Sequence, residues 1–339
     1  MNTAAARVSA LAIVAICVVF AVVGPARPAG YVFEDHRVDT LTVRHMEAGQ
    51  SYYRAMDGAM RTVGVGPVHE SRSFRMPTIF LVWRWLPGHP PASLWIPFVA
   101  MVGITGLLLT GYTTAPLVVP LVVLYLLGTG RNVYSGIYLM VEFWVAPFTA
   151  ATLLSWRRGR GRLAPLFAFL ATVVRELAGG LLVGGLFEAV RRREGRLRWA
   201  LALAAALAAI GVHWAQASQY LVAHGHEAPL LGTSRFPESF LGALGFNLPG
   251  PNVVWLPVWG LAVANLVRRR ELLPVAFYVT LPLIAFWIHR PYWQLLTIPF
   301  VLVWAAELVA DVGSAALARR RGRLPVTGAA ATPVSRSGG

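Results

Sequence analysis

Long apolar runs, separated by short polar segments, recur along most of the chain. A helix rises 1.5 Å per residue, so about 20 apolar residues cross the roughly 30 Å hydrocarbon core of a bilayer. Runs close to this length predict membrane-spanning helices at 8–27, 93–112, 114–130, 136–156, 199–218, 251–267, 272–288 and 293–311. Together with one shorter hairpin, they predict an all-α polytopic membrane protein of about ten transmembrane helices.

The apolar segment 163–190 is too short for two full spans. It runs from the arginine cluster RRGRGR at 157–162 to the cluster RRREGRLR at 191–198, so both of its ends are expected on the same side of the membrane. Two helices of about 13 residues would each cover only about 20 Å. We therefore predict a short or re-entrant helical hairpin inside the bundle, with Arg175 and Glu176 at its turn.

Polar residues gather between the first two apolar runs, at 28–76, and later at 219–250. In the first segment, four apolar side chains recur at helical spacing: Met46, Tyr53, Met56 and Met60. Four charged side chains lie off this stripe: Glu47, Arg54, Asp57 and Arg61. The pattern predicts an amphipathic helix on the membrane surface. The segment 75–91 is interrupted by prolines and predicts a helix that dips into the membrane.

The composition supports the bilayer as the solvent. The 339 residues are 56% hydrophobic and 13% charged, with a mean hydropathy of +0.58, which is too apolar for a soluble domain. The net charge is +15, but 16 of the 30 basic residues lie in four arginine clusters beside apolar runs. Because such clusters mark the cytoplasmic ends of helices, the charge indicates topology and not nucleic-acid binding.

The arginine clusters predict that 28–76 and 219–250 lie outside and that both termini are cytoplasmic, as in a multi-pass protein of the bacterial cytoplasmic membrane. Residues 1–315 are expected to form one transmembrane domain. The arginine-, glycine- and serine-rich residues 316–339 predict a disordered cytoplasmic tail. A signal peptide is the alternative for the first run, but the later spans and a poor cleavage site favour a retained anchor.

Ionisable residues inside spans are costly, so they pair or take part in function. Glu142 lies within a span, Arg175 and Glu176 at the hairpin turn, and His289 and Arg290 at an outer helix end. Glu142 can equally serve packing through an interhelical hydrogen bond. Adjacent residues on a helix point about 100° apart, so Arg175 and Glu176 are expected to find other partners. An arginine in the outer half of the bundle suits a phosphate, with a structural ion pair as the alternative.

The histidines and the single cysteine give no metal site. Cys17 lies inside the first apolar run, and the sequence HGHE at 224–227 lacks a third ligand at fixed spacing. His213, within the span 199–218, is expected to be a core histidine whose hydrogen bonds are satisfied.

Several sequence elements resemble, in order, those of small bacterial members of the GT-C class of membrane glycosyltransferases. The elements are GQSYYRAM (49–56), FRMPTIFLVWRWLP (74–87), VEFWVAPFTAATLLSW (141–156) with VVREL (173–177), and RPYWQLLTIPF (290–300). The class takes a sugar from a polyprenyl-phosphate carrier at the outer face of the membrane, so the resemblance implies this donor and a cell-envelope glycan or lipid as acceptor. The soluble outer domain of most members has no counterpart here.

The resemblance also implies catalytic carboxylates near the start of the first outer loop. We expect Asp35 or Asp39 to be the base, with Glu34 as neighbour or alternate, because the usual Asp-Glu pair occurs here in reverse order. A divalent metal cofactor is left open, and none of its ligands is identified. A membrane transporter or lipid flippase and a non-enzymatic membrane scaffold remain as alternative functions.

A basic residue that grips the lipid phosphate of the donor is a further implication. We assign this role to Arg175. Three further residues are expected to assist it: Arg75, Arg290 and His289. Glu142 and Glu176 are expected to orient these cationic groups.

Overall fold

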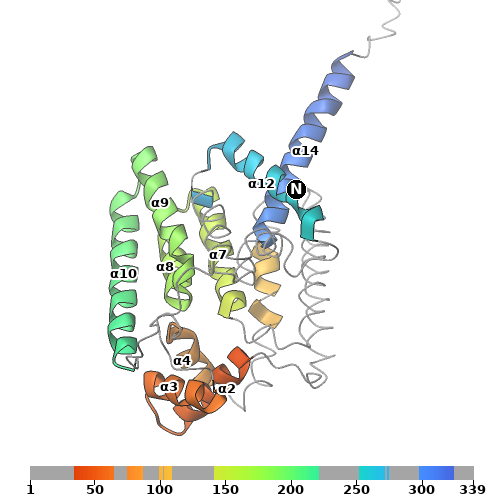
Figure 1. The fold of residues 1–339 in the computed structure, drawn as a ribbon. Coiled ribbons are helices and arrows are strands. Elements are labelled where there is room, and N and C mark those ends of the chain that lie inside the picture. Colours follow the sequence, from red (N-terminus) through yellow and green to blue (C-terminus); the bar gives the residue numbers. More distant parts are fainter. Residues whose placement is uncertain are drawn as a thin grey trace, which may run out of the picture.

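The computed structural model describes residues 34–64, 75–86, 99–101, 103–108, 141–220, 252–271, 273–274 and 298–323. The all-α class is confirmed for this part of the chain, which forms helices and no strand (Figure 1). Two of its helices are long and apolar enough to cross a membrane, namely α10 (Arg196–Ser218) and residues 300–317 of α14 (Ile298–Arg323). The expected count of about ten spans is not confirmed, since the runs 8–27 and 114–130 lie outside the described residues.

Four consecutive helices form a bundle: α7 (Val141–Arg157), α8 (Leu163–Val174), α9 (Gly179–Arg192) and α10. Consecutive members pack on one another, and α8 also contacts α10. Short turns join α7 to α8 and α9 to α10, so neighbouring helices run antiparallel and both arginine-rich turns lie at the same end (Figure 1). Glycine serves one of these turns at Gly195, whose φ of 65° lies in the left-handed region.

The predicted hairpin at 163–190 is confirmed. Helix α8 ends at Val174, Arg175 is extended, and η4 (Glu176–Ala178) leads directly into α9. The turn therefore lies at Arg175 and Glu176, which divide the apolar segment 163–190 into two parts of similar length. At 12 and 14 residues, α8 and α9 are each shorter than a full span.

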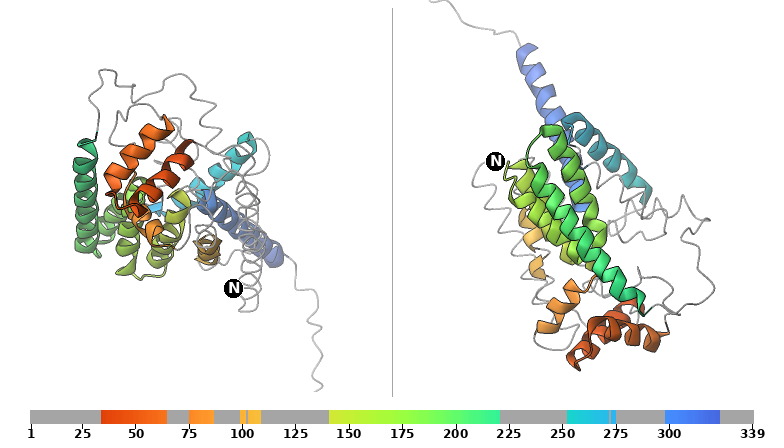
Figure 2. Two further views of the ribbon diagram at one scale, coloured as in Figure 1. Left: turned by 90° about the horizontal axis from the view of Figure 1, so that it is seen from below. Right: turned by 90° about the vertical axis from the view of Figure 1, so that its left-hand side faces the viewer.

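Helices α2 (Glu34–Glu47), α3 (Tyr52–Val63) and α4 (Thr78–Trp85) cover the opposite end of the bundle (Figures 1 and 2). We call these three helices the cap. Helix α4 occupies eight residues of the segment in which a dipping helix was expected.

The prediction of one amphipathic helix on the membrane surface is wrong. Gly49 has a φ of 90° and interrupts the helix, so the apolar stripe is divided between α2 and α3. Met46, Met56 and Met60 are at most 3% exposed and pack into the protein core. The apolar stripe was correctly identified, but its methionine side chains pack against the neighbouring helix and the rest of the protein core.

The remaining described helices form a second group, in which η5 (Asn252–Trp255) leads into α12 (Leu256–Arg269) and α12 packs against α14. Helix α14 projects beyond the bundle at the arginine-rich end (Figure 1). It remains helical to Arg323, eight residues into the segment predicted to be a disordered tail.

The outer surfaces of α9 and α10 are apolar. Large exposed hydrophobic side chains on these helices are Val183, Phe187, Val190, Leu197, Leu201, Leu207, Val212 and Trp214. Water would penalise such a surface, whereas hydrocarbon would not. With the length of α10, this surface supports membrane association.

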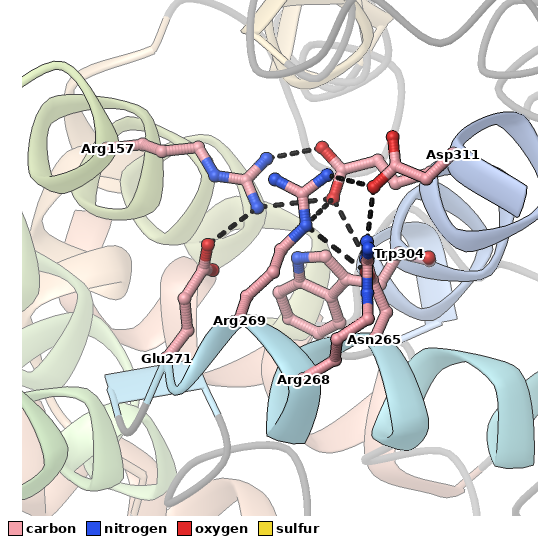
Figure 3. Close-up of polar contacts among 8 residues, drawn as sticks. Arg157, Asn265, Arg268, Arg269, Glu271, Trp304 and Asp311 are labelled. Atoms are coloured by element: carbon pink, nitrogen blue, oxygen red, sulfur yellow. Dashed lines mark hydrogen bonds and ion pairs between the residues drawn. The ribbon is translucent and has the colours of Figure 1, made fainter. Parts of the chain in front are cut away.

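A charge network joins α7 to α12 and α14 at the arginine-rich end (Figure 3). The guanidinium of Arg157 donates to both carboxylate oxygens of Glu307, which is 3% exposed, and to Glu271 at 2.9 Å. The buried amide of Asn265 donates to Glu307 at 3.1 Å and to the carbonyl of Trp304 at 3.0 Å. The buried Glu307 carboxylate is thus held from two other helices.

The rim of this network is more exposed. Arg268 and Arg269 of α12 both donate to the Asp311 carboxylate of α14 and to the side-chain oxygen of Asn265. Exposed pairs of this kind contribute little singly. They extend the contact between α12 and α14 beyond the buried part of the network.

Replacing Gly185 by alanine is expected to destabilise the packing of α9 on α10. A Cβ atom at Gly185 would lie 2.1 Å from the Trp199 ring, which is itself 1% exposed. Overpacking of this kind costs about 1–3 kcal/mol. Gly211→Ala is the control, because a Cβ on that residue of α10 would meet nothing within 4 Å. Thermal unfolding in detergent measures both variants, and an equal Tm would contradict this packing.

Removal of Arg157 should destabilise the protein more than removal of an exposed arginine. Arg157→Gln removes the closest cation from the buried Glu307 carboxylate and leaves Arg269 at 3.9 Å; breaking a buried pair costs up to about 3–5 kcal/mol in unfolding free energy. Adding Glu307→Gln should recover much of the loss because no buried charge then remains. Arg160→Gln, in the exposed α7–α8 turn, is the control. Similar denaturation midpoints for the two single variants would argue against a structural role for the network.

Candidate functional site

The candidate site lies where the cap meets the turn between α8 and α9, at the end of the bundle opposite the arginine-rich turns (Figure 1). Helix α4 contacts both α8 and α2. Its first residue, Thr78, donates through Oγ1 to the carbonyl of Val173 at 2.6 Å. This hydrogen bond ties the start of α4 to the end of α8, and so brings residues just before α4 close to the hairpin turn.

A buried ion pair joins α2 to the segment before α4. Arg75 donates through Nη1 to Oδ2 of Asp39 at 2.6 Å. The Asp39 side chain is 1% exposed and the Arg75 side chain 18%. A charge-assisted hydrogen bond in such surroundings is strong. Asp39 lies within α2, one helical turn after Asp35.

The phenol of Tyr52, at the start of α3, reinforces this pair. Its hydroxyl donates to the backbone carbonyl of Arg75 at 2.5 Å. Burial raises the pKa of the Tyr52 phenol well above its usual value, and the negative charges of Asp39 and Glu176 add to the rise against the opposing charge of Arg75. The phenol therefore remains a donor at neutral pH. The Tyr52 hydroxyl is thus influenced by the negative charges of both Asp39 and Glu176.

A second ion pair occupies the hairpin turn. Arg175, which is buried, donates through Nη1 to Oε1 of Glu176 at 2.9 Å. The expectation that these adjacent residues would not pair with each other is wrong. That expectation assumed helical backbone, whereas Arg175 is extended, with φ −146° and ψ 112°, and η4 begins only at Glu176.

Aromatic side chains fix α3 against α10 beside the site. The Tyr53 hydroxyl and Nδ1 of His213 are 3.0 Å apart, and His213 is 3% exposed. The Tyr53 ring lies edge-on to that of Tyr52, at 5.0 Å between centroids, and parallel to that of Tyr220 at 6.4 Å. The prediction that His213 is a core histidine with a satisfied hydrogen bond is confirmed.

Four of the predicted site residues come together in these two pairs: Asp39, Arg75, Arg175 and Glu176. The backbones of Glu34 and Asp35 lie in α2 and that of Glu142 in α7, but their side chains are outside the described residues. His289 and Arg290 also lie outside them. Within the described part of the chain, no three His, Cys, Asp or Glu side chains gather as metal ligands.

Sequence reasoning assigned no role to Tyr52. Its signal was the tyrosine doublet in GQSYYRAM, where two phenols follow a glycine and a helix-starting serine. Tyr52 bonds the Arg75 carbonyl, and the Tyr53 hydroxyl contacts the His213 ring. Adjacent helical residues diverge by about 100°, so a doublet can serve two partners.

The site combines two guanidinium groups, two carboxylates and a neutral phenol in a largely dehydrated place. Such a set can hold an anionic group and can accept a proton from a bound hydroxyl. No protein-family model, no curated protein sequence and no solved structure matches this chain.

Tyr52→Phe should reduce the dependence of stability on high pH. Because the pKa of Tyr52 is raised in the folded state, the unfolded chain loses this proton first. Its stabilising contribution is thus complete below about pH 10 and is lost as the pH rises through the folded-state value. The variant also removes the hydrogen bond from Tyr52 to the Arg75 carbonyl, at a cost of ~0.5–1.5 kcal/mol at neutral pH.

Denaturation of wild type and Tyr52→Phe between pH 8 and 11 measures this effect. The loss of unfolding free energy above about pH 10 should be smaller in the variant. Tyr53→Phe is the matched comparison, because the Tyr53 phenol is less buried and should flatten the profile less. Parallel profiles for wild type and Tyr52→Phe would contradict the burial of this phenol.

Proposed function

We propose that this chain transfers a sugar from a polyprenyl-phosphate donor to a cell-envelope glycan or lipid acceptor at the outer face of the bacterial cytoplasmic membrane. The observation that carries the proposal is the meeting of two arginine–carboxylate pairs, Asp39–Arg75 and Arg175–Glu176, around Tyr52. The site's position fits an outer active face. It lies opposite the arginine-rich turns, which the positive-inside rule assigns to the cytoplasm together with both termini.

The chemistry of the donor requires what this site contains. A sugar leaving a lipid phosphate transfers negative charge to the phosphate oxygen, and guanidinium groups stabilise that charge. Both arginines are fixed by carboxylates, so little reorganisation is needed when the charge develops. The acceptor hydroxyl must lose a proton, for which a carboxylate is a suitable base. A divalent metal remains open as a cofactor.

A lipid flippase or transporter is the second candidate. It is favoured by the interruption of the α8–α9 hairpin at a buried arginine, since broken helices often line transport sites. Such a protein would move the lipid phosphate without breaking the bond between sugar and phosphate. A product assay therefore separates the two functions.

The decisive experiment offers the purified protein, in liposomes, radiolabelled polyprenyl-phosphate sugars together with envelope membranes from cells that lack the chain. Wild type should move label from the donor to a product that is no longer linked to polyprenyl phosphate. Arg175→Gln should reduce the rate by about 10²–10³-fold, as expected when one preorganised donor to a developing anion is removed. Arg54→Gln, at an exposed position of α3, is the control and should retain activity.

Movement of intact donor across the bilayer without a glycosylated product would replace the transferase proposal with the flippase. Neither product nor movement with any donor, combined with unchanged envelope glycans in cells that lack the chain, would favour a membrane scaffold.

A further inference from the structure

The two carboxylate oxygens of Glu176 differ in their surroundings. Oε1 accepts the hydrogen bond from Arg175 at 2.9 Å. Oε2 is shielded from solvent and accepts no hydrogen bond from the described residues. A dehydrated carboxylate oxygen without a donor is unfavourable. A group of this kind in a native protein needs an explanation, and a bound ligand that supplies the donor is one.

The groups around Glu176 leave this oxygen available to a ligand. Arg175 is directed to Oε1, and the Tyr52 hydroxyl donates to the Arg75 carbonyl. Asp39, from α2, is bonded to Arg75, from the segment before α4. Each of these hydrogen bonds goes to an acceptor other than Oε2. The missing donor at Glu176 can therefore come from a substrate hydroxyl.

The alternative carboxylate in the described site, Asp39, is more deeply buried. Each of the two carboxylates has one oxygen bonded by an arginine, and the other oxygen, Oδ1 of Asp39 or Oε2 of Glu176, is shielded from solvent. The side chains differ in exposure, which is 1% for Asp39 and 24% for Glu176, so Glu176 lies nearer to the path of an incoming acceptor. Asp39 is suited to fixing the Arg75 guanidinium.

We infer that Glu176 is the catalytic base, and that its Oε2 accepts the proton of the acceptor hydroxyl. The inference rests on the proposed transferase function. The acceptor oxygen forms a bond to the anomeric carbon of the donor sugar while the bond from that carbon to the phosphate oxygen breaks, and the bonding electrons leave with the phosphate. The acceptor proton passes to Oε2, and Glu176 later releases it to water.

Charge balance gives Arg175 a part in the same step. The donor phosphate gains one negative charge as the sugar leaves, and Glu176 loses one as it takes the proton. A neutral Glu176 holds Arg175 less strongly. Weakening of this pair favours a bond from the guanidinium to the phosphate at the moment when the charge on the phosphate increases.

The test compares wild type, Glu176→Gln and Glu176→Asp in the transfer assay, using the donor that wild type accepts, across a range of pH. Glu176→Gln should lower kcat by about 10²–10⁴-fold and abolish the acid limb of the pH profile, which reports protonation of the base. Glu176→Asp keeps a carboxylate one methylene further back, and should be slower than wild type with the acid limb retained.

Binding of polyprenyl phosphate is the second measurement. Glu176→Gln should bind this lipid at least as tightly as wild type, because a neutral amide competes less strongly than a carboxylate for the Arg175 guanidinium. A merely structural Glu176 would instead lose binding along with activity. Weakened binding in a folded Glu176→Gln would therefore overturn the inference.

The outcomes separate this inference from the function on which it rests. A wild type inactive with every donor removes the transferase function and the inference with it. An active wild type, with Glu176→Gln near the wild-type rate and an unchanged acid limb, overturns only the role of Glu176. If Glu176→Gln does not fold, Glu176→Asp decides: a slower rate with the acid limb retained supports the inference, and an unchanged rate overturns it.

Discussion

The buried ion pair between Asp39 and Arg75 is the interaction on which the architecture of the site depends. It joins the first cap helix, α2, to the segment that leads into α4, and the hydrogen bond from Thr78 to Val173 joins α4 to the hairpin. Burying two charges is unfavourable unless they pair closely, as they do here at 2.6 Å. Tyr52 adds a third cap helix to the same contact. The charged pair therefore holds the parts of the cap together, and a neutral hydrogen bond attaches the cap to the hairpin.

The two ends of the bundle use charge differently. At the arginine-rich end, Arg157 is shared between Glu271 and the buried Glu307, and the Asn265 amide donates a further hydrogen bond to Oε2 of Glu307. That network satisfies its buried carboxylate from several sides and is suited to holding helices together. At the cap end, by contrast, Glu176 has one oxygen without a donor among the described groups. The difference supports the ligand site that is proposed for the cap end.

The sequence predicted those features that follow from length and periodicity. The apolar segment 163–190 was too short for two spans, which required a hairpin turning at Arg175 and Glu176, and the structure has it there. The methionine stripe was correct as a buried face. The break that divides it between two helices was missed, because it depends on one residue, Gly49, in the left-handed conformation. The hydrophobic periodicity does not show whether a glycine ends a helix or is tolerated within it. The Arg175–Glu176 pair was missed because it needs an extended residue at the end of a helix, which no local pattern indicates.

The position of Tyr52 between the two carboxylates has a consequence for how they work together. A phenol whose pKa is raised by burial stays neutral, so it adds no charge between Asp39 and Glu176 and donates one hydrogen bond to a fixed carbonyl. Asp39 is paired with Arg75, and Glu176 with Arg175. In a dehydrated site, ion pairs at such short range respond strongly to a charge that develops on a substrate. In the proposed reaction, Asp39 holds Arg75 in place throughout, while Glu176 takes up the acceptor proton and holds Arg175 less strongly.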